Sequence, residues 1–196
     1  MQMVGSARAI PDPADLLLSD GSLRLEPMAL RHAGALFEAV EISREMLVRW
    51  LTSMMAPDTP EETATFVSER AERWRAGTEF YFVLKDGADC VGIAFLNTFH
   101  PRHRFANLGY WVRTDRAGRG YATRAVRLLA RFGFEQFGLC RIEIVTDVEN
   151  VASQRVAEKA GALREGVLRN RLVGERGPCD GVMFSLVPED LGDFGF

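Results

Sequence analysis

Tyr110-Trp-Val-Arg-Thr-Asp-Arg-Ala-Gly-Arg-Gly-Tyr-Ala122 is the stretch from which the fold of this chain can be worked out. Residues 106–112 are apolar and aromatic, which predicts a buried strand. Residues 122–137 carry apolar side chains at i, i+3, i+4 and i+7, which predicts an amphipathic helix. Gly118 and Gly120 in the turn between them let backbone N–H groups approach a ligand, and the helix start adds free donors and a positive dipole end. The stretch therefore predicts a pyrophosphate site, with an ordinary strand-to-helix connection as the alternative.

Composition and length limit the class of protein. The chain has 196 residues, of which 47% are hydrophobic and 26% charged, as in soluble globular proteins. We expect a loose arm over residues 1–20 and a single domain over 21–196. The net charge of −3 argues against general nucleic-acid binding. No apolar run is long enough for a membrane helix, so we expect a cytoplasmic protein with no membrane contact.

The cysteines and histidines do not suggest a metal site or a disulfide framework. Cys90, Cys140 and Cys179 form no CxxC pair. Cys90 and Cys140 stand in apolar, strand-like runs, so we expect buried free thiols in a reducing compartment. The three histidines lack metal-ligand spacing on a helix, and we expect no bound metal.

Taken in order, the periodicities predict a mixed α/β domain. Strand 106–112, helix 122–137 and strand 141–146 form a βαβ unit, so these two strands should be parallel. The other strands follow hairpin or meander connections and should be antiparallel. The result is a mixed, mostly antiparallel sheet with helices on both faces. The remaining elements are predicted as strands at 23–25 (ended by Pro27), 80–84, 90–99, 163–172 and 181–187, helices at 29–41 and 60–76, a second short helix or helical loop at 42–55, a short helix within 147–161, and a Gly/Pro loop at 174–178.

A second group of residues lies downstream of the turn. By themselves, Asn150 as N-cap and Gly161 as C-terminal glycine describe only a capped helix. In this order and spacing, however, the motifs resemble the GNAT acetyltransferases, and more closely their RimJ/RimL branch. The resemblance runs from about Leu23 to Leu191. The motifs that carry it are Gly118-Arg-Gly-Tyr-Ala122, Asn150-x-x-Ser153, Glu158-Lys159-x-Gly161, Gly109-Tyr-Trp-Val112, Ser43-Arg-Glu45 with Trp50-Leu51, and Glu165-Gly-x-Leu-Arg169.

The resemblance implies acetyl-CoA as acyl donor. The turn amides would hold the pyrophosphate, and arginines 113, 116 and 119 would add charge-assisted hydrogen bonds. The edge of strand 106–112 would pair with the pantetheine arm, freed by splaying from strand 141–146. An amine would then attack the thioester directly, without an acyl-enzyme. The implied cofactor-binding residues are Trp111, Val112, Arg113, Ala117, Gly118, Arg119, Gly120, Tyr121, Ala122, Thr123, Asn150 and Ser153.

Three positions depart from the family's pattern and affect the expected chemistry. Ala117 lacks the side chain that usually opens the turn, and Ala157 replaces the tyrosine that many members use as an acid. Ser153 is then the candidate acid, although a serine there can also simply pack or cap. Asn107 stands where the branch often has a glutamate base, and asparagine cannot take a proton at neutral pH. Glu45, Asp147, Glu149 and His100 are the candidate replacements, with Glu45 the first of them. The predicted catalytic residues are therefore Ser153, Asn107 and Glu45.

The predicted function is acetyl transfer from acetyl-CoA to a primary amine, with α-amines preferred over lysine. The acceptor is a peptide or protein N-terminus or a small amine, including an antibiotic or a metabolite. A CoA-binding module without catalysis is one alternative, and a partner-binding domain with an empty turn is another. The closing strands and the exposed apolar C-terminus, which contains Phe194 and Phe196, could support a homodimer.

Overall fold

The fold is an eight-stranded mixed sheet with the strand order β1-β2-β3-β4-β5-β6-β8-β7. The computed structural model describes residues 9–51, 55–174 and 177–192. Within these residues β5 and β6 pair in parallel and the other neighbouring strands are antiparallel, which confirms the predicted sheet. The strands are β1 (Leu18–Ser19), β2 (Leu23–Pro27), β3 (Phe80–Asp86), β4 (Asp89–His100), β5 (Phe105–Val112), β6 (Arg141–Asp147), β7 (Leu163–Gly174) and β8 (Gly177–Leu186).

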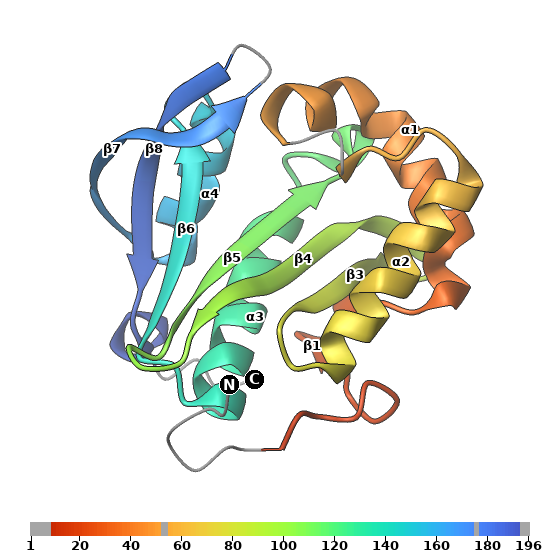
Figure 1. The fold of residues 1–196 in the computed structure, drawn as a ribbon, viewed down its shortest axis with the longest axis horizontal. Coiled ribbons are helices and arrows are strands. Elements are labelled where there is room, and N and C mark those ends of the chain that lie inside the picture. The colour runs from red at the N-terminus through yellow and green to blue at the C-terminus, as the bar shows by residue number, and fades with distance from the viewer. Residues whose placement is uncertain (1–8, 52–54, 175–176, 193–196) are drawn as a thin grey trace.

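Helices cover both faces of the sheet, as the sequence predicts (Figure 1). The helices α1 and α2 pack on one face and α3 and α4 on the other, each over its own cluster of buried apolar side chains. No helix in the described ranges has the length and apolarity needed to cross a bilayer. The helical elements are α1 (Ala33–Trp50), α2 (Pro60–Arg75), α3 (Tyr121–Phe137) and α4 (Val151–Ala160), with 3-10 turns η1 (Leu30–His32), η3 (Thr114–Arg116) and η4 (Pro188–Leu191).

Helix α1 corrects the prediction of two elements at 29–41 and 42–55. It runs without a break through Ile42 to Trp50, and the positions 52–54 lie outside the described residues. Ser43 is the reason for the difference, because a polar residue there interrupts the apolar pattern although its side chain is buried. Its Oγ accepts a hydrogen bond from the backbone N–H of Thr114 at 3.2 Å. A polar side chain with such a partner can lie on the buried stripe of a helix.

The closing hairpin corrects the prediction of a Gly/Pro loop at 174–178. Val173 pairs with Pro178 and Gly174 with Gly177, so the two strands continue almost to the tip. Pro178 is tolerated because β8 pairs with β6 only as far as Gly181 and Asp147, so no bond to β6 needs its missing N–H. Pro27 likewise belongs to β2 as its last residue instead of ending the strand before it.

Two further predictions concern the cysteines and the chain ends. Cys90 is buried as expected. Cys140 is exposed, because it lies in the connection before β6 and not inside the strand. Its Sγ contacts the carbonyl oxygen of His103 at 3.3 Å. Near the N-terminus, Leu18–Ser19 pairs with β2, and the Asp20 carboxylate forms an ion pair with Arg124. The C-terminal phenylalanines that suggested a dimer lie outside the described residues.

Candidate active site

The parallel strands β5 and β6 separate along their length. They pair at Phe105 with Arg141, Ala106 with Ile142 and Asn107 with Glu143, and at no later described position. Beyond Asn107, β5 continues to Val112 with its other edge paired to β4, so the edge that faces β6 is open. The two strands diverge toward the top of the molecule in Figure 1. An open backbone edge can accept an extended polar ligand as an added strand.

The glycine turn lies at the end of this open edge and begins α3. Gly118 and Gly120 have φ values of +77° and +81°, which favour glycine. A Cβ built at either position would meet nothing within 4 Å, so the turn opens into free space. Helix α3 has no side-chain N-cap and no acidic residue in its first turn. Its first N–H groups are therefore free to bind an anion.

The arginines around the turn differ in their availability. Arg113 donates to both carboxylate oxygens of Asp115, at 3.0 and 2.7 Å, and to the carbonyl oxygen of Cys90. Arg116 forms an ion pair with Asp89. Arg119, in contrast, is exposed between the two glycines. Of these side chains, Arg119 can turn toward a phosphate without breaking a carboxylate pair.

The remaining turn residues are positioned by their neighbours. Ala117 is exposed, whereas Ala122 and Thr123 are half-buried in the first turn of α3. The side chain of Tyr121 is buried, and its hydroxyl donates to the Asp86 carboxylate, which raises the pKa of the phenol. The Tyr121 side chain therefore anchors the first turn of α3 to the end of β3.

The start of α4 faces the open edge of β5 through Ser153 and Tyr110. Asn150 is the N-cap of α4, and its Oδ1 accepts the N–H of Ser153 at 3.0 Å. The hydroxyl oxygen of Tyr110 lies 3.0 Å from Ser153 Oγ and 3.1 Å from the Ser153 carbonyl oxygen. Burial raises the pKa of Tyr110 to about 12, so its phenol keeps its proton at physiological pH. This contact crosses the gap between the sheet and α4.

Two buried polar atoms on the splayed strands have no partner among the described residues. They are Thr146 Oγ1 on β6 and Trp111 Nε1 on β5. Both residues lie beyond the last pair that joins the strands, where the edge is open. Buried polar groups usually have a hydrogen-bond partner, so such atoms indicate a place for a ligand or a water molecule. Trp111 lies in the apolar cluster under α1 and α2, whereas Thr146 alternates with Ile142 and Ile144 and so faces α3 and α4, as the turn does. The turn amides and Thr146 Oγ1 together fit a ligand that has both phosphates and a polar extended arm.

Asn107 lies at the last rung of the parallel pair, on the sheet face that carries α1 and α2. Its Nδ2 donates to Asn97 Oδ1 at 2.9 Å. Its register partner, Glu143, is on the same face and accepts a hydrogen bond from Arg141 Nε at 2.9 Å. The position predicted for a base therefore holds an amide with a carboxylate on the next strand.

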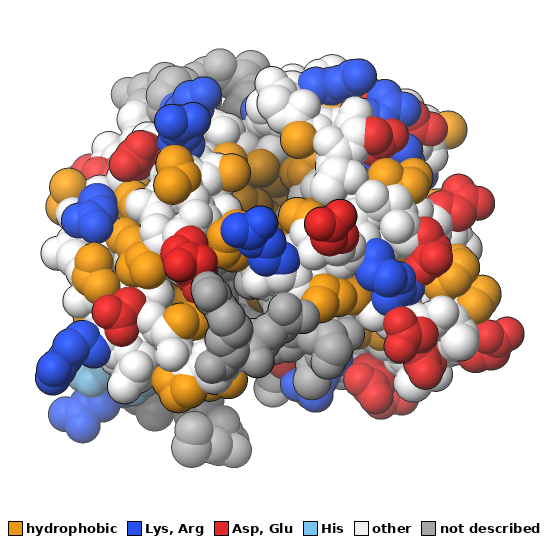
Figure 2. Space-filling model, turned by 90° about the horizontal axis from the view of Figure 1, so that it is seen from above, with side chains coloured by type: hydrophobic (Ala, Val, Ile, Leu, Met, Phe, Trp, Pro, Cys, Tyr) orange, Lys and Arg blue, Asp and Glu red, His pale blue; other side chains and the backbone are white. Residues whose placement is uncertain are grey.

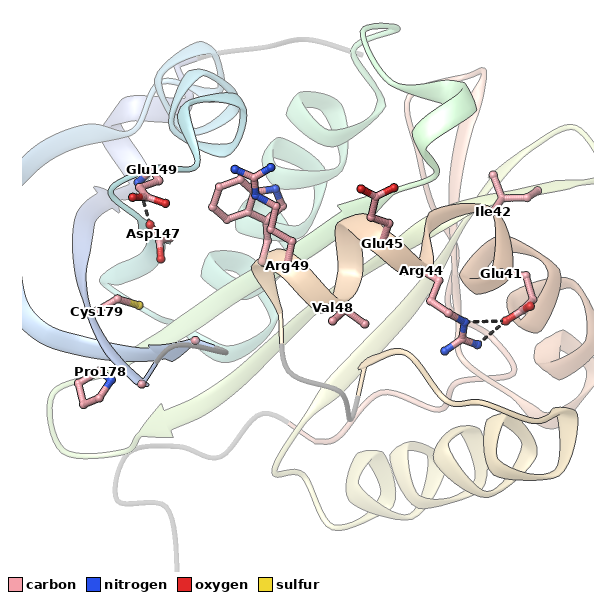
Figure 3. Close-up of a pocket in the computed structure, with 13 residues that line it drawn as sticks. Glu41, Ile42, Arg44, Glu45, Val48, Arg49, Asp147, Glu149, Pro178 and Cys179 are labelled. Carbon is pink, nitrogen blue, oxygen red and sulfur yellow. Dashed lines mark hydrogen bonds and ion pairs between the residues drawn. The ribbon is translucent and has the colours of Figure 1, made fainter.

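A groove with a volume of about 1130 Å³ lies between α1 and the closing hairpin. Glu45 lines it from α1 and has an exposed side chain, while Asp147 and Glu149 line it from the end of β6. Figure 3 shows these carboxylates on opposite sides of the groove, and Figure 2 shows this face hollowed near its middle, with hydrophobic side chains in the hollow. The full lining is Glu41, Ile42, Arg44, Glu45, Val48, Arg49, Trp50, Asp147, Glu149, Gly174, Gly177, Pro178 and Cys179.

The groove lining has four carboxylates and two arginines, Arg44 and Arg49, so its net charge is negative. Arg44 donates to Glu41, to Asp58 and to the carbonyl oxygens of Ala56 and Pro57, so its charge ties residues 56–58 to α1. Carboxylates around an open groove attract cations such as an ammonium group.

The structure brings most of the predicted residues to one region but divides them between two faces of the sheet. The turn, the edge of β5, Asn150 and Ser153 lie on the side of α3 and α4. Asn107 and the groove with Glu45 lie on the side of α1 and α2. Sequence reasoning missed Tyr110 and Glu143 as site residues. For Tyr110 the signal was its place in the Gly-Tyr-Trp motif, and for Glu143 it was a charged residue in an otherwise apolar strand.

An open parallel pair beside an uncapped glycine turn agrees with the class of acetyl-CoA-dependent acetyltransferases that the sequence resembles. The model of the acetyltransferase (GNAT) domain family matches residues 22–163, and the chain belongs to that family. YdaF of Bacillus subtilis (strain 168) is 30% identical over 172 residues, which are 85% of this chain and 90% of YdaF. The ribosomal-protein-serine acetyltransferase of Escherichia coli (strain K12) is 24% identical over 148 residues, 76% of this chain and 83% of that protein.

A solved structure supports the same grouping. Mycobacterium smegmatis RimJ in complex with CoA-disulfide superposes with a TM-score of 0.81 at 26% identity, covering 90% of this chain and 87% of that chain. The protein is thus a GNAT acetyltransferase with RimJ/RimL-type relatives.

Proposed function

We propose that this protein transfers the acetyl group of acetyl-CoA to the α-amino group of a peptide or protein N-terminus in the cytoplasm. The observation that carries the proposal is the open edge of β5, which leads to the uncapped turn at Gly118–Ala122, together with the groove lined by Glu45 on the α1 and α2 side of the sheet. A donor held along the edge and an acceptor held in the groove would meet where the strands separate. The names of the ribosomal-protein acetyltransferase relatives support a protein acceptor.

The donor would be held mainly by backbone groups. The amides from Gly118 to Thr123 would bind the pyrophosphate with Arg119, while the edge at Trp111 and Val112 would pair with the pantetheine arm. Thr146 Oγ1 is available to the same arm from β6, and Asn150 lies at the start of α4 beside it. Arg113 would act by fixing the backbone before the turn, since its side chain already pairs with Asp115.

The transfer requires a neutral amine and a stabilised leaving group. The amine nitrogen forms the new C–N bond, the C–S bond breaks, and the electron pair stays on the sulfur while the nitrogen loses its extra proton. Ser153 is the hydroxyl that would donate to the developing thiolate. Asn107 would orient a water molecule but cannot accept the proton, and Glu45 is the carboxylate that would receive it in the groove.

Because the site has no strong general base among the described residues, it favours acceptor amines that are already partly deprotonated. An α-amino group has a pKa of about 7.8, so roughly a quarter is neutral near pH 7.3. A lysine amine with a pKa of about 10.4 is neutral about one time in a thousand, which adds about 3.5 kcal/mol to the barrier. We therefore expect α-amines to react faster than lysine side chains.

The experiment that tests this function measures CoA thiol release with matched peptides. One peptide has a free N-terminus and no lysine, and the second has a blocked N-terminus and one lysine; spermidine represents small amines. Turnover of the first peptide well above the second supports the proposal. Faster turnover of the blocked peptide or of spermidine contradicts it.

Acetyl-CoA binding without thiol release from any amine would instead indicate a binding module, the alternative that Asn107 and Ala157 favour. A thermal-shift measurement with acetyl-CoA separates these outcomes, because ligand at about 100 times its Kd stabilises a protein by about 2.7 kcal/mol. An unchanged melting temperature at saturating acetyl-CoA would contradict both the enzyme hypothesis and the binding-module hypothesis.

A further inference from the structure

The contact between Tyr110 and Ser153 joins the open edge of β5 to the first turn of α4. The Tyr110 hydroxyl oxygen is 3.0 Å from Ser153 Oγ and 3.1 Å from the Ser153 carbonyl oxygen. The ring of Tyr110 packs against the apolar cluster beneath α3 and α4. The hydroxyl is therefore held at this place by a fixed ring.

The proton count at this contact allows two arrangements. A carbonyl oxygen only accepts, and Tyr110 has a single proton to donate. In the first arrangement Tyr110 donates to the Ser153 carbonyl, and Ser153 Oγ donates its proton back to Tyr110. In the second, Tyr110 donates to Ser153 Oγ, and the Ser153 proton is free to point elsewhere. Only the second leaves a serine donor for another group.

We propose that Tyr110 is a positioning residue for Ser153, which it orients by donating to Ser153 Oγ when the thioester is bound. This inference rests on the proposed function. The Ser153 O–H then points at the sulfur, and it stabilises the electron pair that the sulfur receives as the C–S bond breaks and the C–N bond forms. Tyr110 keeps its own proton throughout, in agreement with the raised pKa of its buried phenol.

A purely structural role explains less of the geometry. The start of α4 already has an N-cap, because Asn150 accepts the N–H of Ser153. A tyrosine that only anchored the helix would need the carbonyl contact alone, yet the same hydroxyl also reaches Ser153 Oγ. A donor to a serine oxygen makes that serine a better donor in turn, because chained hydrogen bonds polarise one another.

The test compares Tyr110→Phe, Ser153→Ala and the double variant, using CoA thiol release with the free-N-terminus peptide. Loss of one orienting hydrogen bond should lower kcat of Tyr110→Phe about 3- to 10-fold. The KM for acetyl-CoA should stay unchanged, since the phenylalanine ring keeps the packing. Ser153→Ala should lose at least as much, and the double variant should be no slower than Ser153→Ala, because Tyr110 acts only through that serine.

Tyr81→Phe is the matched control, since it removes a buried tyrosine hydroxyl on β3 and should leave kcat unchanged. Three results would each overturn the positioning role. In the first, the losses of the two single variants multiply in the double variant. In the others, Tyr110→Phe mainly raises the KM for acetyl-CoA, or it leaves kcat unchanged. If the wild-type protein binds acetyl-CoA but acetylates no amine, the proposed function fails and this role with it. If the wild type is active and the coupling is absent, only the positioning role fails.

Discussion

Substitution of Gly120 by alanine separates backbone strain in the turn from loss of ligand binding. Gly120 precedes α3 with φ +81°, and a Cβ there meets nothing within 4 Å. In the unliganded protein the only cost is therefore the left-handed conformation, about 1–2 kcal/mol for an L-residue. At about 2–4 °C per kcal/mol for a domain of this size, the melting temperature should fall by about 2–8 °C.

Gly138→Ala is the matched control at the opposite end of the same helix. Gly138 has φ +62° and also has free space around its Cβ, so its substitution should cost a similar amount. Acetyl-CoA at about 100 times the wild-type Kd should raise the melting temperature of the wild type and of Gly138→Ala by about 5–10 °C. In Gly120→Ala the new methyl group lies among the turn amides. If it weakens acetyl-CoA binding tenfold, the rise in melting temperature should be about half of the wild-type rise.

Differential scanning calorimetry with and without acetyl-CoA gives both quantities for all three proteins. An equal ligand-induced rise in Gly120→Ala and Gly138→Ala would refute the reasoning that the turn amides hold the donor. A much larger loss of stability in unliganded Gly120→Ala than in Gly138→Ala would refute the reasoning that strain is the only cost.

Three further results are expected. Arg141 lowers the pKa of the Glu165 carboxyl from 4.5 to about 2, so the stability from this ion pair is present above pH 4.5 and is lost as the pH falls toward 2. The variant Glu165→Gln lacks this carboxyl, so its melting temperature should fall less steeply between about pH 5 and 3. A slope equal to that of the wild type would contradict this expectation. Gly92→Ala places a Cβ 2.1 Å from the carbonyl oxygen of Trp111, and should lower the free energy of unfolding by about 1–3 kcal/mol in urea titrations. If the variant were as stable as the wild type, β5 would be able to move away from the new methyl group without loss of stability. Asn107→Glu supplies a proton acceptor, so the rate should begin to rise at a pH below the α-amine pKa of about 7.8, and lysine acetylation should increase. A pH profile identical to that of the wild type would show that the proton is transferred to a group other than residue 107.

Much of the fold was predictable because its signals are local. The strand, glycine turn and helix around Gly118 are encoded in consecutive residues, and so are the caps at Thr59 and Asn150, whose side chains accept the expected N–H groups. The connection between β5 and β6 then determines that the two strands are parallel. Helix α1 was divided in the prediction because the sequence pattern cannot show that Ser43 has a buried partner.

The sequence by itself determined the order of the elements, the parallel pair and the turn, since hydrophobic period, glycine and capping residues act within a few positions. Only the tertiary structure decided where the strands separate, that Glu143 adjoins Asn107, and that the Tyr110 hydroxyl meets Ser153 from 43 positions away. These contacts depend on the register of the strands and on the placement of α4 against the sheet. Both are set by the packing of residues distant in the chain, which no local pattern records.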